Sequence, residues 1–464
     1  MSSLLPLDWG FSKLLAYSPE VCLRPTYISL THKIDVDHFF DMFIATAGKR
    51  LREYLQKRTQ KEFALDQLRD KILYRKIEGS PPSFNVAGVD GGIGVVKLAN
   101  GHQVVLARAA AVGSDFIERE FIADIASVDS ASLPWAYLVI VESLVGMRAL
   151  EKHGVDVLLM DGSLYAKAVR LVHNLILTRE FQNLYYVPEL ATALYTLSRL
   201  IKTARERGAR LVFVSKDHNY KLLKEHVIFE ILGERYRDHL FQRGLLWYSV
   251  LWIRKFRKEL LELYKTIRNY DYEGARLLTL LITPSITDIE ILAEILPSGH
   301  YTVPMLVGGC DAYMNFKGLT TVERLVKAAE DRLEDSLIFR LKDNFNSNIL
   351  EYIRDALDTF PKIYFFYIKF DRDESPLLVE IPVEGTRMFD GSPVKAFYPP
   401  ARVDDVVSLL REQFRDPVHY NTWLWYAHSV ASFKSSQLSE YAVYLKNMVE
   451  DVGIARRIKL AWGL

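Results

Sequence analysis

Two carboxylates stand at matching places in this sequence. Asp90 follows the apolar run 86–89 and precedes two glycines, and Asp161 follows the apolar run 157–160 and precedes Gly162. An unpaired carboxylate is expensive to bury, so packing alone rarely places one at the end of a buried strand. Two such acids on neighbouring strands would form a site of hard oxygen ligands, which Mg²⁺ and Mn²⁺ prefer. The alternative for each is a turn-forming Asp, and the repeated pattern favours the metal site.

Three further residues are candidates for the same chemistry. Glu142 interrupts an apolar helical stretch and is a possible third ligand; the alternative is a surface or arginine-paired glutamate. His428 ends an aromatic segment that starts at Tyr420, and a spacing of eight residues, about two helical turns, can place both on one helix face. A histidine there is a metal ligand, an acid–base group or a satisfied core residue.

Basic residues are candidates for contacts with phosphate. Lys216 follows the apolar segment 210–215 and is either a phosphate contact at the edge of a sheet or a solvated loop residue. The segment 254–268 mixes Arg and Lys with aromatic residues. Base stacking and phosphate contacts need that mixture, and helix packing against a core would use it as well.

The residues around these candidates predict the elements that hold them. Strands are expected at 84–89, 94–98, 103–111, 116–126, 155–160 and 210–215, and helices at 35–77, at 133–152 and over much of 165–207. Asn100-Gly101 between two apolar runs is typical of a hairpin. Antiparallel strands followed by helix, strand, helix and strand indicate an α/β fold with a mixed sheet, compatible with a ribonuclease-H-like core.

The second half of the chain adds helices and a return to strands. The expected elements are helices through 225–296, strands at 362–370 and 377–383, and two final helices at 403–414 and 422–449. We therefore predict three parts: an N-terminal helical segment (1–82), a nuclease-like core (83–224 and 362–464) and a mainly helical insertion (225–361).

Composition limits the class of protein. The 464 residues are 49% hydrophobic and 25% charged, with a net charge of +1, which argues against a uniformly basic nucleic-acid coat. Cys22 and Cys310 are the only cysteines, so we expect a reducing, cytoplasmic compartment and no zinc site. No uninterrupted apolar run nears the ~18 residues of a membrane span, and the abundance of Lys, Arg and Glu leans towards a thermophile.

In their order and spacing, the candidate motifs resemble the NurA nuclease family of archaea and some bacteria. The resemblance consists of Val-Asp-Gly-Gly at Asp90, an acidic helix position at Glu142 and Asp-Gly-Ser at Asp161. It continues with Ser-Lys at Lys216 and with a tyrosine eight residues before the histidine of an Ala-His pair. The bulky residues 423–425 depart from the family pattern, which has a proline-containing approach to this histidine.

The resemblance implies a PIWI-like, ribonuclease-H-like fold and a Mn²⁺-dependent deoxyribonuclease, with Mg²⁺ as an alternative ion. It implies a 5′–3′ exonuclease with single-strand endonuclease activity in DNA double-strand-break end resection, working as a homodimer with the hexameric HerA translocase. Asp90, Glu142, Asp161 and His428 would be metal ligands, Tyr420 would support the site, and Lys216 would contact DNA phosphate.

Two other classes of protein use similar features. An actin-like nucleotide-binding protein also places Asp-Gly turns around phosphates, but it would need a second matching subdomain, and the sequence shows no clear duplication. A non-catalytic DNA clamp or helicase adaptor would keep the fold without the chemistry. Measurements of nucleotide binding and of metal-dependent cleavage separate these classes.

Overall fold

The computed structural model divides the chain into two units, residues 1–59 and residues 60–464. The described residues are 40–48, 50–51, 65, 67–98, 101–127, 130–177, 181–216, 218–242, 257–282, 286–308, 319, 321–339, 348–390, 395–397 and 402–448. In the first unit, residues 40–48 and 50–51 are helical, as the periodicity predicts. The second unit contains the sheet and all of the candidate site residues.

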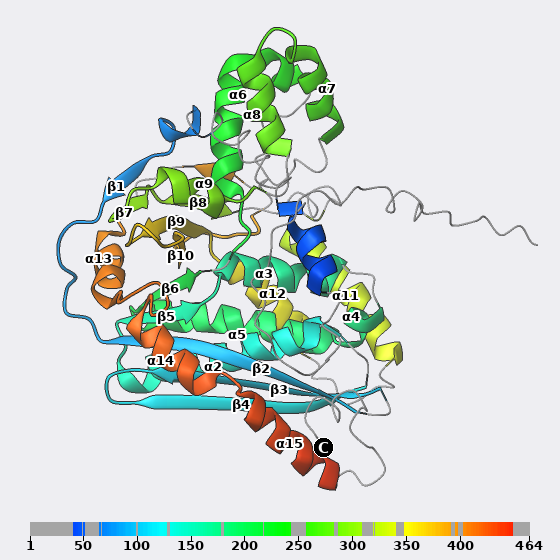
Figure 1. Cartoon of the computed structure of the whole chain (residues 1–464). Coiled ribbons are helices and arrows are strands. Elements are labelled where there is room, and N and C mark those ends of the chain that lie inside the picture. The colour runs from blue at the N-terminus through cyan, green and yellow to red at the C-terminus, as the bar shows by residue number, and fades with distance from the viewer. Residues whose placement is uncertain are drawn as a thin grey trace, which may run out of the picture. The chain divides into compact units, whose positions relative to one another are not determined.

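One mixed sheet organises the second unit, and the described residues contribute eleven strands to it (Figure 1). These are β1 (Tyr74–Lys76), β2 (Val86–Lys97), β3 (Gln103–Val112), β4 (Ile117–Ala126), β5 (Val157–Asp161), β6 (Arg210–Ser215), β7 (His300–Thr302), β8 (Met305–Gly308), β9 (Ile363–Lys369), β10 (Leu377–Pro382) and β11 (Lys395–Phe397). The order is β1-β7-β9-β10-β6-β5-β2-β3-β4, and β8 pairs with β9 and β11. Strands β2, β3 and β4 are antiparallel neighbours, whereas β5 and β6 run parallel to β2. The mixed α/β sheet predicted from the sequence is confirmed.

Helices cover both faces of this sheet. They are α2 (Ser132–His153), α3 (Leu164–Val172), α4 (Phe181–Tyr185), α5 (Val187–Glu206), α6 (Leu222–Gln242), α7 (Arg257–Ile267), α8 (Tyr272–Ile282), α9 (Asp288–Ile295), α11 (Val322–Phe339), α12 (Ile349–Thr359), α13 (Asp404–Gln413), α14 (Thr422–Ala431) and α15 (Ser435–Met448), with a π-helical segment at His173–Leu177. One apolar core joins α2, α3 and α5 to one face of the β2–β5–β6 region. A second core joins α13 and α14 to the opposite face.

Several predicted boundaries are wrong in ways that matter for the site. The strands expected at 84–89 and 94–98 form a single strand, β2, which continues through Asp90 and both following glycines. Asp90 is therefore not at the end of a strand. The expected helix 35–77 is wrong at its end, because Tyr74–Lys76 forms β1 at the far edge of the sheet. A three-residue strand carries too little periodicity to be recognised locally.

The C-terminal helix expected at 422–449 is also wrong, because two helices occupy this segment. Helix α14 ends at Ala431, and Ser432 adopts an extended conformation before α15 begins. The hairpin between β2 and β3 is confirmed by their antiparallel pairing and by Gly101, whose φ of 89° suits a tight turn. Asn100 and the segment 243–256 lie outside the described residues.

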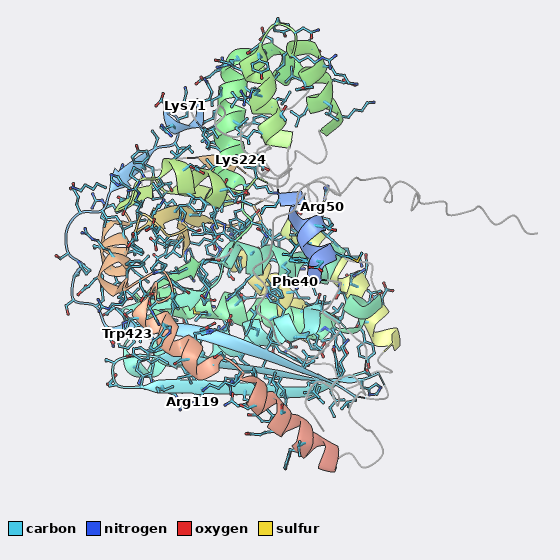
Figure 2. All side chains as sticks on the ribbon, in the orientation of Figure 1. Phe40, Arg50, Lys71, Arg119, Lys224 and Trp423 are labelled. Carbon is cyan, nitrogen blue, oxygen red and sulfur yellow. The ribbon has the colours of Figure 1, made fainter. Side chains whose placement is uncertain are left out.

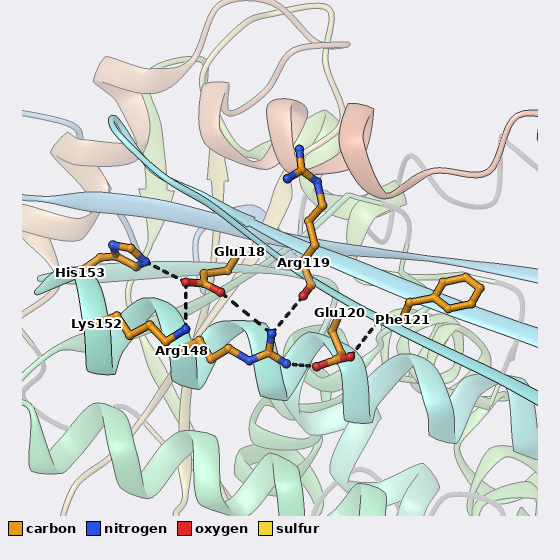
Figure 3. Close-up of polar contacts among 7 residues, drawn as sticks. All are labelled: Glu118, Arg119, Glu120, Phe121, Arg148, Lys152 and His153. Atoms are coloured by element: carbon orange, nitrogen blue, oxygen red, sulfur yellow. Dashed lines mark hydrogen bonds and ion pairs between the residues drawn. The ribbon is translucent and has the colours of Figure 1, made fainter.

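Helix α2 is the element that brings Glu142 to the sheet. By length and composition it could cross a membrane, although Glu142 and Arg148 interrupt its apolar run, and 72% of its most apolar window is buried. Ion pairs join its C-terminal half to β4 (Figure 3). Glu118 accepts hydrogen bonds from Lys152 Nζ at 3.3 Å and contacts His153 Nε2 at 3.0 Å, and Arg148 pairs with Glu120. Burial and these pairs hold α2 on the sheet as a core helix.

Candidate active site

The register of two parallel strands places Asp90 beside Asp161. Val89 of β2 is paired with Met160 of β5, so the next residue of each strand is an aspartate. Side chains alternate between the faces of a sheet, and Leu159 packs into the core beneath α13 and α14. Both aspartates therefore point to the α13–α14 face. They lie side by side because β2 and β5 are neighbours in the sheet.

Helix α14 lies unusually close to β2, and glycine permits this approach. A Cβ added to Gly92 would lie 2.4 Å from the carbonyl oxygen of Ala431, a distance that no side chain tolerates. The same helix carries His428, whose Nδ1 lies 2.6 Å from Asp90 Oδ2. Gly92, the second glycine after Asp90, thus serves helix packing rather than the turn that the sequence pattern suggested.

Asp90 and His428 form a pair of which one member is buried and the other is exposed to solvent. Asp90 is 6% exposed, and its Oδ1 accepts the backbone N–H of Gly91 at 2.7 Å. Burial, followed by the charge of Asp161, raises the pKa of Asp90, whereas the contact with His428 opposes that rise. The His428 side chain is 59% exposed. With Nδ1 donating to Asp90, Nε2 is left to accept a proton or bind a cation.

Tyr420 reaches the other aspartate from outside the helix. Its hydroxyl donates to Asp161 Oδ1 at 2.6 Å. The expectation that Tyr420 and His428 share a helix face is wrong, because Asn421 is the N-cap of α14 and Tyr420 precedes it. Lys216, at the end of β6, has its Nζ 5.5 Å from the centre of the Tyr420 ring. The structure thus brings Lys216 to the same group of residues, on the exposed side.

Glu142 approaches from the other side of the sheet. It lies on α2 and is 4% exposed, and its Oε2 accepts a hydrogen bond from Lys167 Nζ at 2.6 Å. A Cβ on Gly91 would lie 3.1 Å from Glu142 Oε1, so the first glycine of the pair provides room for this carboxylate. Burial raises the pKa of Glu142 to about 7; Lys167 opposes the shift, and the charges of Asp90 and Asp161 add to it.

Lys167 is a member of the site that sequence reasoning missed. It belongs to the first turns of α3, is 7% exposed, and also donates to the carbonyl oxygen of Asp161 at 2.9 Å. A lysine near a helix N-terminus opposes the helix dipole. Its position among apolar residues, six residues after Asp161, was the available signal that it has an anionic partner.

Glu380 is a second residue that the sequence analysis missed, and its side chain accepts a hydrogen bond at the N-terminus of α3. It lies in the middle of β10, and its Oε2 accepts the backbone N–H of Tyr165 at 3.2 Å, while Ser163 caps the helix by accepting from Ala166 at 3.0 Å. Burial raises the pKa of Glu380 to about 7. A charged residue inside an apolar strand is the same signal that singled out Asp90.

The donor set fits a hard divalent cation. In the part of the chain that the structure describes, no three His, Cys, Asp or Glu side chains converge as a closed set of metal ligands. Asp90 and Asp161 nevertheless lie side by side with like charges; burial raises the pKa of Asp90 most, and the charge of Asp161 adds to that rise. A divalent ion between carboxylate oxygens relieves such repulsion. Asp90, Asp161 and the free nitrogen of His428 are suited to bind it.

A scan of protein families matches residues 84–433 to the NurA domain, well over half of the chain. The chain belongs to the NurA domain family, so the resemblance noted in the sequence is confirmed. The matched residues include all six predicted site residues.

Three crystal structures are similar to this chain, each at 16% identity. One of NurA has a TM-score of 0.37 and covers 88% of this chain and 97% of its own, and one of NurA with manganese has 0.36, 87% and 98%. The third, of NurA bound to dAMP and manganese, has 0.35, 86% and 95%. A search of curated proteins finds no match.

Proposed function

We propose that this protein is a metal-dependent deoxyribonuclease that hydrolyses phosphodiester bonds. The observation that carries the proposal is the pair of in-register aspartates at the β2–β5 junction of a NurA-family domain, with Asp90 buried, Asp161 half-buried and the exposed His428 beside Asp90. The crystal structures of NurA with manganese and with dAMP and manganese suggest the same ion and substrate. We propose Mn²⁺ as the cofactor, with Mg²⁺ as the alternative.

The carboxylates of Asp90 and Asp161 would hold the cation. Bound there, it would lower the pKa of an attacking water and stabilise the leaving oxygen of the DNA. Asp90 orients the His428 imidazole through Nδ1, which leaves Nε2 to accept a proton from water at the exposed mouth of the site. Tyr420 donates to one oxygen of Asp161, and the other oxygen would be available to hold the cation.

Lys216 is suited to bind the scissile or neighbouring phosphate. It is exposed, and it lies over the Tyr420 ring. Among the described residues it forms no ion pair. An ammonium at this position attracts the DNA backbone and offsets the net negative charge of the carboxylates.

We further propose that the core is ribonuclease-H-like. Three antiparallel strands, a helix and two strands parallel to the first appear in the chain order β2-β3-β4-α2-β5-β6. The resulting order β4-β3-β2-β5-β6 within the sheet puts the first strand at its centre beside β5. Acids on those two strands then meet, which is the arrangement that a carboxylate-bound cation needs.

The biological setting that we propose follows from family membership. It is 5′–3′ exonuclease and single-strand endonuclease activity in end resection of DNA double-strand breaks, in the cytoplasm, by a homodimer that works with the hexameric HerA translocase. The near-neutral net charge of +1 supports a partner that delivers DNA, because the chain as a whole attracts the DNA backbone only weakly.

A cleavage assay with 5′- and 3′-labelled DNA tests the activity. We expect cleavage with Mn²⁺, none with EDTA, and none by Asp90→Asn. Asp156→Asn is a matched control, because Asp156 accepts the backbone N–H of Asn85 at 2.8 Å outside the cluster and asparagine keeps that acceptor. Full cleavage by Asp90→Asn, or cleavage that survives EDTA, would overturn the proposal.

A further inference from the structure

A lysine ammonium lies within the acidic cluster, and both of its contacts are buried. Lys167 Nζ is 2.6 Å from Glu142 Oε2 and 2.9 Å from the carbonyl oxygen of Asp161. The side chains of Lys167 and Glu142 are 9% and 6% exposed. A pair this deep is held in one geometry, because leaving either charge alone in the interior would be expensive.

Glu142 and the two aspartates belong to opposite faces of the sheet. Asp90 and Asp161 point to the α13–α14 face, where His428 and Tyr420 contact them. Glu142 comes from α2 on the other face, and Lys167 passes 5.7 Å from the centre of the Phe213 ring, which belongs to the core on that same face. The pairing with Lys167 therefore keeps Glu142 on the α2 side.

The buried pair of Lys167 and Glu142 leaves no place for a second divalent ion at this carboxylate. Lys167 Nζ already contacts Glu142 Oε2 and the carbonyl oxygen of Asp161. A second ion bound by Glu142 would have to displace Lys167, leaving an ammonium without its carboxylate in the interior.

We infer that Lys167 neutralises Glu142 in place of a second divalent ion, so that each chain binds a single Mn²⁺ on the Asp90–Asp161 side. This inference rests on the proposed metal-dependent function. It makes Lys167 a positioning residue, which acts through Glu142 and through the backbone of Asp161. It also assigns Glu142 to the pairing with Lys167 rather than to the metal.

Titration with Mn²⁺ in the absence of DNA, followed by electron paramagnetic resonance of the free ion, counts the bound ions. We expect one ion per wild-type chain. Glu142→Gln keeps an oxygen acceptor for Lys167, so its Kd for Mn²⁺ should stay within about threefold of wild type, whereas loss of a ligand costs at least ~10–100-fold. Asp161→Asn provides that contrast.

Two substitutions of the lysine separate its charge from its packing. Lys167→Met frees the Glu142 carboxylate and should raise the count from one ion to two, while Lys167→Arg keeps the charge and should bind one. Circular dichroism establishes whether each variant is folded. If Lys167→Met does not fold, the Kd of Glu142→Gln for Mn²⁺ tests whether Glu142 is a metal ligand.

Three results would overturn the inference: two ions on the wild-type chain, loss of Mn²⁺ binding in Glu142→Gln, or one unchanged ion in Lys167→Met. These outcomes differ from failure of the proposed function. A wild-type chain that binds no Mn²⁺ removes the metal-dependent function itself, whereas a chain that binds two and still cleaves DNA removes only the role given to Lys167.

Discussion

Two of the buried lysines among the described residues, Lys167 and Lys224, lie near acidic side chains, and these acids differ in how many hydrogen bonds they accept. Lys224, in the first turn of α6 (Figure 2), is 1% exposed and donates to the carbonyl oxygens of Leu280 at 3.2 Å and Ile286 at 2.9 Å. Near it, Asp288 accepts the backbone N–H groups of residues 223 and 224 and the hydroxyl of Tyr367 at 2.7 Å. This cluster ties α6, α8 and α9 to β9.

The Lys167 cluster has the opposite balance. It contains one ammonium, paired with Glu142, and two further carboxylates, Asp90 and Asp161, and the pair Asp90–His428 extends to solvent. In the other cluster, burial lowers the pKa of Lys224 and raises the pKa of Asp288, because burial disfavours the charged form of each group. There, one acid accepts the N–H groups at one helix end. The comparison teaches that burial alone does not distinguish the candidate site from a structural cluster. An excess of carboxylates over ammonium groups, together with access to solvent, does.

The largest expected effect separates the two clusters by activity. Asp161→Asn should lower the cleavage rate by on the order of 10³-fold or more, because it removes a charged oxygen from the cation. Its unfolding free energy should be unchanged or higher, because a like charge next to Asp90 is gone. Cleavage assays and urea unfolding measure both. Asp288→Asn is the matched control and should cleave at the wild-type rate per folded molecule; slow cleavage there would contradict the comparison.

Stability should respond to the other cluster. Asp288→Ala removes the acceptor for two N–H groups of α6 and for Tyr367, and it removes one of the negative charges near Lys224. We expect a loss of about 3–5 kcal/mol of unfolding free energy, measured by urea unfolding. A loss below about 1 kcal/mol would show that this cluster does not hold the helices to the sheet.

The pH dependence of stability should reveal Glu380. Burial raises its folded pKa to about 7, above the 4.5 of the unfolded chain, so the folded state binds the proton more tightly. The stability from this group is complete below pH 4.5 and is lost as the pH rises to 7, by roughly 3 kcal/mol at most. Glu380→Gln does not titrate, so its stability relative to wild type should rise across that window. A constant difference from pH 4 to 8 would exclude this role.

The smallest effect concerns Tyr420. Tyr420→Phe removes the hydroxyl that orients Asp161 and should slow cleavage by roughly 10–100-fold at saturating Mn²⁺, because oriented ligands bind and act better. Tyr426→Phe, on the exposed side of α14, is the control and should keep the wild-type rate. Equal rates for the two variants would remove Tyr420 from the site.

Much of the site was accessible from local sequence. The carboxylates Asp90 and Asp161 are identifiable because charge after an apolar run is improbable without a partner, and α2 is predictable from its apolar length and from Gly154 at its C-cap. Lys167 and Glu380 were missed although each interrupts an apolar element. Their partners are 25 and 215 residues away in the sequence, so no local pattern names them.

The sequence by itself determined the element types near the site, the two acids that follow apolar segments and the family. Tertiary structure alone decided that β2 runs through Asp90, that Glu142 pairs with Lys167, and that Tyr420 acts from outside α14. The contact between Asp90 and His428 spans 338 residues. Periodicity reports which face of its own element a residue occupies, whereas the partner across that face depends on strand order and close packing.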